Sequence, residues 1–388
     1  MVACRIVPVV LSLLLASYSI AQNGSPRQQE QAALPPESLS FGEVSSVPVP
    51  SLPAESIEAP LLCDKQGRIL FRLATPEAGV EDPVSVSSDG KTVVRFAREK
   101  MNDITHPVIL SVFFADSDVY LLTRGSTPLG YRTKWRTPTG EVIEQQASKS
   151  STFVAHFMPD GSYAGAVVLD VPFQAMRLGV FENGDFLIAG AEPTSEEPRV
   201  AIVASNGQLR RLLELKGDVH ARQNSGTSQE SSDPTALPRM VPAPGDLPMS
   251  SFAETLMVVV STSQVVRDGR NLLLIRPVRA PVFSISPSGE ISVHKLKIDG
   301  DYTLYTIKPD GDLWIVEFLR NVPNSEAVEL STYAFDPESG LPLRKYLLAP
   351  DAGWGLACAD SDTLTFVAAD EKTNSLKIVK LAAGAGAN

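Results

Sequence analysis

The chain has 388 residues, and 45 acidic residues against 34 Lys and Arg give it a net charge of −11. Nucleic acids and anionic membrane surfaces are bound through basic patches, so this charge argues against either as a partner. The acidity itself is most simply explained as keeping the protein soluble.

The first 21 residues have the pattern of a secretory signal peptide. Arg5 is followed by the apolar run Ile6–Ile20, and a small residue, Ala21, marks the expected cleavage site. A membrane anchor is the competing interpretation, but Pro8 and Ser12 interrupt a run that is shorter than the ~20 apolar residues of a span. Cleavage would remove Arg5 and bring the charge from −11 to −12. We therefore expect a secreted or periplasmic protein without a membrane span.

Residues 22–57 are rich in Gln, Ser, Pro and Glu and show no sustained hydrophobic period. Such a composition buries too little apolar surface to offset chain entropy. It predicts a flexible tether, and residues 382–388 are expected to form a flexible tail.

Strand–turn–strand patterns then repeat through residues 58–381. Hairpins of one kind occupy 61–73, 111–125, 179–190, 264–276, 306–318 and 357–370. A second hairpin of different character follows each of the first five, and a single strand, 375–381, follows the sixth. Two hairpins make four antiparallel strands, the unit of a propeller blade. The sequence predicts an all-β, six-bladed β-propeller; a β-sandwich would not explain the alternation of two hairpin types.

Insertions account for the uneven spacing of the repeats. Residues 130–146 read as an extra hairpin, and residues 216–250 as a polar loop. The sixth blade lacks its outermost strand. We expect the amino-terminal side to supply it, within Phe41–Val49, because an open sheet edge is disfavoured.

The stretches TIKPDGDLWIVEF (306–318) and GVFENGDFLIAG (179–190) resemble the first half of the repeat in six-bladed propellers of the NHL and TolB-like type. The resemblance covers most of residues 58–381 at the level of pattern. It implies the fold and no particular activity, because propellers host many functions.

Two cysteines remain after signal cleavage, Cys63 and Cys358, each just before the turn of the first or the last hairpin of the inner kind. In a closed ring those strands are neighbours, and an exported protein meets oxidising conditions, so a disulfide is one prediction. The alternative is two buried free thiols, since adjacent inner strands can stand too far apart to be bridged.

The sequence shows no recognisable catalytic set. His106, His156, His220 and His294 show no metal-ligand spacing and lack a nucleophile or phosphate motif beside them. Paired aspartates on the turns are explained by local hydrogen bonding. We predict no catalytic residues, no metal site and no cofactor.

Arginines end the second strand of several inner hairpins, at the face opposite the tight turns. Such guanidinium groups can bind a carboxylate, a phosphate or an acidic sugar, or each can pair with an acid of the next blade. The candidate ligand-binding residues are Arg72, Arg124, Arg276, Arg279, Arg320 and Trp354.

Two functional classes follow from these observations. The first is an exported binding or scaffold propeller for a protein or a small anionic or carbohydrate ligand, and the missing catalytic set favours it. The alternative is an enzyme, a lyase or hydrolase acting in an axial pocket. We expect a monomer.

Overall fold

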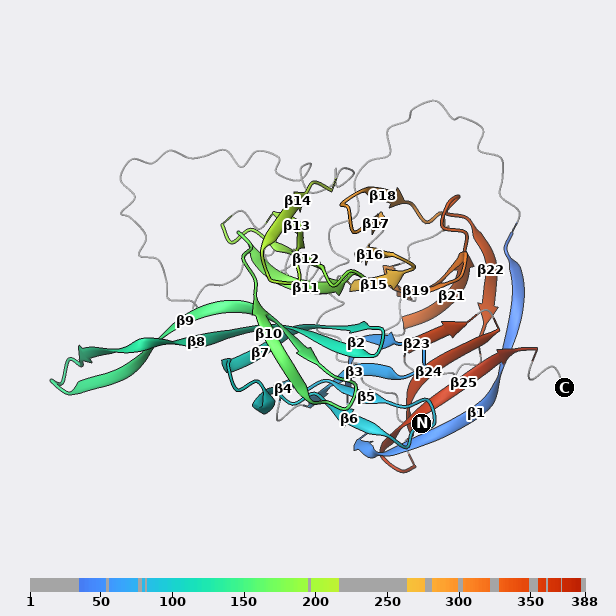
Figure 1. Ribbon diagram of the computed structural model, residues 1–388. Helices are drawn as coiled ribbons and strands as arrows, with labels where there is room; N and C mark the ends of the chain where they lie inside the picture. The colour runs from blue at the N-terminus through green and yellow to red at the C-terminus, as the bar shows by residue number, and fades with distance from the viewer. Residues whose placement is uncertain are drawn as a thin grey trace, which may run out of the picture.

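The computed structural model describes residues 35–53, 56–75, 79–80, 82–194, 197–215, 264–275, 281–298, 303–321, 328–348, 355–360, 362–370 and 372–384. In these ranges the protein is all-β, and its helical content is one short 3-10 helix, η2 (Arg98–Lys100). The sheets stand around a common axis in a propeller-like arrangement (Figure 1). The predicted signal peptide and the polar loop at 216–250 lie outside the described residues.

Four of the sheets follow one another along the chain between Ser56 and His294. The first has the order β2 (Ser56–Cys63), β3 (Ile69–Thr75), β5 (Val84–Val86) and β6 (Val93–Arg95), with β4 (Gly79–Val80) beside β3. The second contains β7 (Thr105–Ala115), β8 (Asp118–Arg136), β9 (Val142–Phe157) and β10 (Tyr163–Val168). The third contains β11 (Gln174–Val180), β12 (Phe186–Ala191), β13 (Pro198–Val203) and β14 (Leu209–Leu213). The fourth contains β15 (Gln264–Asp268), β16 (Asn271–Ile275), β17 (Val282–Ile285) and β18 (Ile291–His294).

The remaining strands form one sheet of eight. Its order is β19 (Thr303–Asp310), β20 (Leu313–Asn321), β21 (Val328–Phe335), β22 (Pro342–Leu347), β1 (Glu37–Pro53), β25 (Ser375–Ala383), β24 (Thr363–Asp370) and β23 (Gly355–Asp360). The described residues thus form five hydrogen-bonded sheets, where the sequence predicted six separate ones. The difference arises at β1, which pairs in parallel with β22 and antiparallel with β25 and so joins two sets of strands.

The innermost strand of each set lies at the axis. These strands contact one another in the order β2, β7, β11, β15, β19 and β23, and β23 contacts β2. The chain therefore returns to its starting point, and the first and last hairpins become neighbours.

The tight turns beside the axis have the chemistry that the sequence indicated. Gly184 and Gly311 adopt φ values of 81° and 56°, in the left-handed region that glycine enters without strain. In the first turn, Asp64 accepts hydrogen bonds from the backbone N–H groups of Gln66 and Arg68 at 2.9 and 2.8 Å. These contacts fix the ends of the innermost strands.

Apolar side chains fill the space between neighbouring sheets. Trp314 of β20 is fully buried with Ile307 and Phe335. Its indole N–H donates to Asp268 at 3.0 Å, which satisfies the one polar group of the ring.

The amino-terminal tether is shorter than predicted. Residues 37–53, assigned to it from their Pro- and Ser-rich composition, form β1 instead. Phe41 to Val49 pair with β25 from Ala383 to Leu376, so β1 supplies the strand that the sixth hairpin set lacked. The composition of residues 37–53 did not predict this strand, because its apolar side chains are buried against strands that are distant in the sequence.

The expected extra hairpin at 130–146 has no separate strands of its own. It is the continuation of β8 and β9, which pair out to Arg136 and Val142 and project from the body (Figure 1).

The contribution of β1 to stability can be tested with a matched pair of valines on that strand. Val49 is 1% exposed and packs with Leu52 and Leu61, whereas Val44 is 54% exposed. Val49→Ala is expected to lower the free energy of unfolding by about 2 kcal/mol. Val44→Ala should change it by less than about 0.5 kcal/mol. Equal effects in guanidinium unfolding would contradict the packing of β1 against the ring.

Candidate functional site

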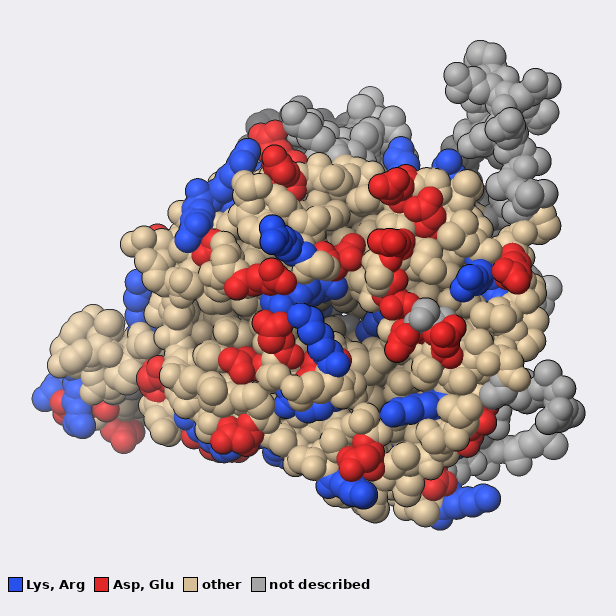
Figure 2. All heavy atoms as spheres, turned by 45° about the vertical axis from the view of Figure 1, so that its right-hand side comes forward, with Lys and Arg blue, Asp and Glu red and all other residues tan. Residues whose placement is uncertain are grey.

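A cavity of about 550 Å³ opens at the axis, at the end where the tight turns lie. Its wall includes residues at the ends of β2, β7, β15, β19 and β23, together with Glu182 after β11. Because each innermost strand contributes a short segment, the cavity exists only in the assembled ring. Figure 2 shows acidic and basic side chains gathered around a hollow in this part of the surface.

The charged side chains of the wall carry both signs. The cations are Lys65, Arg267 and Lys308, and the acids are Asp64, Asp116, Glu182 and Asp268. Asp116 is shared by Lys65 at 3.5 Å and Arg267 at 3.3 Å. Arg267 also donates to the Val180 carbonyl at 2.7 Å. Two of the three cations are thus held by one acid.

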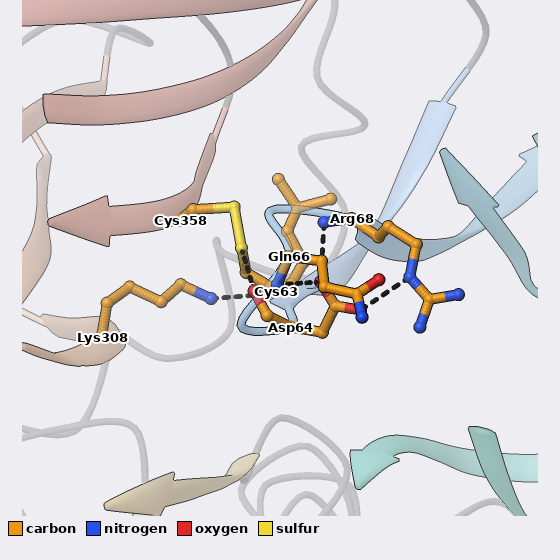
Figure 3. Close-up of a disulfide and its surroundings, with 7 residues drawn as sticks. Cys63, Asp64, Gln66, Arg68, Lys308 and Cys358 are labelled. Atoms are coloured by element: carbon orange, nitrogen blue, oxygen red, sulfur yellow. Dashed lines mark hydrogen bonds and ion pairs between the residues drawn. A yellow bond between two sulfur atoms is a disulfide. The ribbon is translucent and has the colours of Figure 1, made fainter. Parts of the chain in front are cut away.

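Lys308 is the third cation, and it is buried. It extends from β19 and donates a hydrogen bond to the carbonyl of Leu61 on β2. Figure 3 shows Lys308 and Cys358 approaching the Cys63–Asp64 segment from one side, with Arg68 on the other. In the described part of the chain, no carboxylate lies within ion-pair distance of the Lys308 ammonium.

The disulfide beside Lys308 joins Cys63 to Cys358 across 295 residues of sequence, with Cα atoms 5.3 Å apart. Both cysteines belong to the cavity wall. The disulfide therefore forms part of the site and joins the first and last innermost strands.

Glu317 lies on β20, directly opposite Thr306 of β19, and is 1% exposed. Its Oε2 accepts a hydrogen bond from the Leu356 backbone N–H at 3.4 Å, whereas its Oε1 is buried without a hydrogen-bond partner. Burial raises the pKa of Glu317 to about 7, against the opposing effects of the Leu356 N–H and Lys308. Burial likewise lowers the pKa of Lys308 to about 8, although the Glu317 carboxylate favours its charged form.

Lys308 and Glu317 are a buried amine and a buried carboxyl whose pKa values both lie close to neutral pH. This arrangement permits ligand binding and proton transfer. The ammonium of Lys308 has three donors, of which the Leu61 carbonyl takes one. A ligand carboxylate in the cavity could take another. The pair also has pKa values in the range in which proton transfer is efficient near neutral pH.

Two of the arginines proposed from sequence, Arg72 and Arg124, are described by the structure, and neither belongs to the wall of this cavity. Arg72 of β3 donates to the carbonyl of Ile109 on β7 at 2.9 Å, and Arg124 is exposed on β8. Arg320 belongs to β20, but its side chain lies outside the described residues, as do Arg276, Arg279 and Trp354 entirely. None of the described candidates belongs to the wall of the cavity, so ligand binding by these arginines stays a proposal.

Two of the histidines have well-defined partners. His156 lies 2.7 Å from Asp118 and stacks on Tyr120, and His294 lies 2.7 Å from the Pro337 carbonyl. His220 lies outside the described residues. Within the described ranges, no group of three His, Cys, Asp or Glu side chains could hold a metal ion.

Sequence reasoning missed Lys308, Glu317 and Arg267. The sequence did contain a signal, because Lys308 and Glu317 interrupt the apolar run TIKPDGDLWIVEF. That run was interpreted only as a repeated hairpin. A charged residue inside a strand that is covered on both faces needs a partner. Such a residue is therefore a candidate for a functional site.

No family model matches the chain, and no curated protein matches it. Solved structures with similar folds include the WD40 domain of Neurospora crassa Pan2, at 10% identity and a TM-score of 0.41, covering 90% of this chain and 98% of that one. Virginiamycin B lyase from Staphylococcus aureus is similar at 9% identity and a TM-score of 0.38, covering 88% and 99%. An exported protein of Bacteroides fragilis, described as putative in its name, has 12% identity and a TM-score of 0.43, covering 88% and 98%. All three TM-scores are below 0.5.

The burial of Glu317 predicts a pH-dependent stability difference. In the folded protein the carboxyl keeps its proton up to about pH 7, whereas in the unfolded chain it releases it near roughly pH 4.5. The wild type therefore loses stability as pH rises between these values. Glu317→Gln cannot titrate, so it should gain on the order of 2 kcal/mol over the wild type between pH 5 and pH 8. A difference in unfolding free energy that does not change with pH would contradict the assignment.

Proposed function

We propose that the chain is an exported six-bladed propeller that binds a small anionic ligand, such as an acidic sugar, in its axial cavity. The signal-peptide pattern of residues 1–21 supports export. In the described part of the structure no helix is long and apolar enough to cross a membrane.

The count of six rests on the contacts of the innermost strands and on the division of the eight-stranded sheet. The strands β19 to β22 form one antiparallel set, and β23 to β25 with β1 form another. The two sets are joined through the four residue pairs of β1 and β22. The repeats at 179–190 and 306–318 support the NHL or TolB-like type within this proposal.

The observation that carries the ligand proposal is the ammonium of Lys308. Burying a charge without an ionic partner is unfavourable, and a carboxylate or phosphate in the cavity would pair with it. Lys65 and Arg267 already share Asp116, whereas Lys308 has no carboxylate within ion-pair distance among the described residues. The mixed charge of the wall further favours a ligand with hydroxyl or amino groups beside its acid.

The same residues support an enzyme as the second candidate. Glu317 and Lys308 have pKa values of about 7 and about 8, and groups whose pKa values are shifted in this way are often catalytic. A lyase or hydrolase would use them as acid and base. The binding role is preferred because Glu317 is not part of the cavity wall.

Ligand binding can be tested by thermal unfolding of the mature chain with glucuronate, citrate or glucose. The acids are expected to raise the melting temperature by a few degrees at saturating concentration, whereas neutral glucose should not. Lys308→Met keeps the apolar stem and should abolish the shift.

Lys91→Met is the matched control, because Lys91 is an exposed lysine on the turn between β5 and β6, away from the cavity wall. It should retain the shift in full. Equal responses to glucose and the acids, no response to any of them, or a shift that survives Lys308→Met would overturn the proposal.

A further inference from the structure

The continuation of β8 and β9 beyond the body is a two-stranded ribbon, residues 127–149, which we name the arm. The pairing of β7 with β8 ends at Ser126, and β10 pairs with β9 from Phe153 onward. Both edges of the arm are therefore without a neighbouring strand among the described residues, and it projects from the body (Figure 1).

A ribbon of two strands is marginally stable by itself in water, and three or more strands are needed for independent stability. The arm also exposes large apolar side chains. Tyr131 is 59% exposed, Trp135 is 51% exposed and Val142 is 54% exposed. A further strand would supply both hydrogen bonds and apolar cover.

The two edges of the arm differ in their proline and charged residues, and this difference determines which edge can pair with another strand. The β8 edge carries Pro128 and three basic residues, Arg132, Lys134 and Arg136. Proline and clustered charge are the means by which edge strands avoid pairing. From Val142 to Ser148 the β9 edge has no proline and no cluster of charges. Its one charged residue, Glu144, is paired with Lys134 at 3.5 Å. The β9 edge is thus the one open to another strand.

The β9 sequence is complementary to itself in one antiparallel register. With Gln145 at the two-fold axis, residues whose numbers sum to 290 lie opposite each other in the two copies. Lys149 then faces Glu141 of the second copy, the turn residue directly before β9, twice by symmetry, and Glu144 faces a neutral Gln146. No like charges lie directly opposite each other, the two Glu144 residues being diagonal neighbours, and opposite charges on facing positions stabilise a sheet.

Apolar positions agree with the same register. Ile143 would face Ala147 of the second copy, and Ile143 is already opposite Trp135 within the arm. Residues that face each other across antiparallel strands share one face of the sheet. Trp135, Ile143 and Ala147 would therefore continue one apolar stripe across the junction.

We propose that the protein forms a two-fold symmetric dimer in which the β9 edges of two arms pair antiparallel around Gln145, giving a four-stranded sheet. The dimer replaces the monomer expected from sequence. It is independent of ligand binding in the cavity, because no residue of the arm belongs to the cavity wall.

The test is sedimentation equilibrium of the mature chain with charge-reversed variants. The wild type is expected to show a concentration-dependent dimer. Lys149→Glu or Glu141→Lys each place like charges opposite one another twice and should weaken the dimer by about tenfold. The double variant Lys149→Glu with Glu141→Lys restores opposite charges and should recover the wild-type affinity, which excludes misfolding as the cause.

Arg132→Glu makes the same change of charge on the β8 edge and is the matched control, with no expected effect on the dimer. Hydrogen exchange should show slower exchange of the amides of residues 142–149 as protein concentration rises. The proposal is overturned if the wild type is a monomer at every concentration, if the double variant fails to recover, or if Arg132→Glu weakens the dimer as much as Lys149→Glu.

Discussion

The structure depends on joining the two ends of the chain. Sheets placed around an axis leave the last sheet free unless something holds it to the first, and two contacts do this here. The strand β1 completes the sheet of β23 to β25 by pairing with β25, and it also packs its buried Val49 with Leu61 of the first sheet. The disulfide between Cys63 and Cys358 joins the innermost strands of the same two sheets. A covalent link across so long a segment removes much of the freedom of the unfolded chain.

Closure has a second consequence at the axis. Each innermost strand pairs on one side only, so its other row of backbone groups needs partners from elsewhere. Long side chains of neighbouring sheets provide them. Lys308 donates to the Leu61 carbonyl, Arg267 to Val180 at 2.7 Å, and Gln264 to Tyr305 at 2.7 Å. The polar character of the cavity therefore follows from the fold, and a ligand would use groups that already stabilise the ring.

The fold was predictable from sequence to a considerable extent, and the site was not. Turn residues such as Gly184 and Gly311 act locally, so their meaning could be read from a few neighbours. The strand β1 could be placed only in part, because its partners are more than 300 residues away. Lys308 and Glu317 have their roles through Leu61 of β2 and Leu356 of β23, which are distant in the sequence, and no local pattern reveals such contacts. The arginines were proposed from position alone, and Arg72 is engaged with a backbone carbonyl of the next sheet.

The cavity and the charges of its wall both follow from the closed ring. The most direct test is peptide mapping of the protein without reduction. The account predicts a cross-linked peptide containing Cys63 and Cys358, which separates into two on reduction. Recovery of both cysteines as separate alkylated peptides before reduction would contradict it.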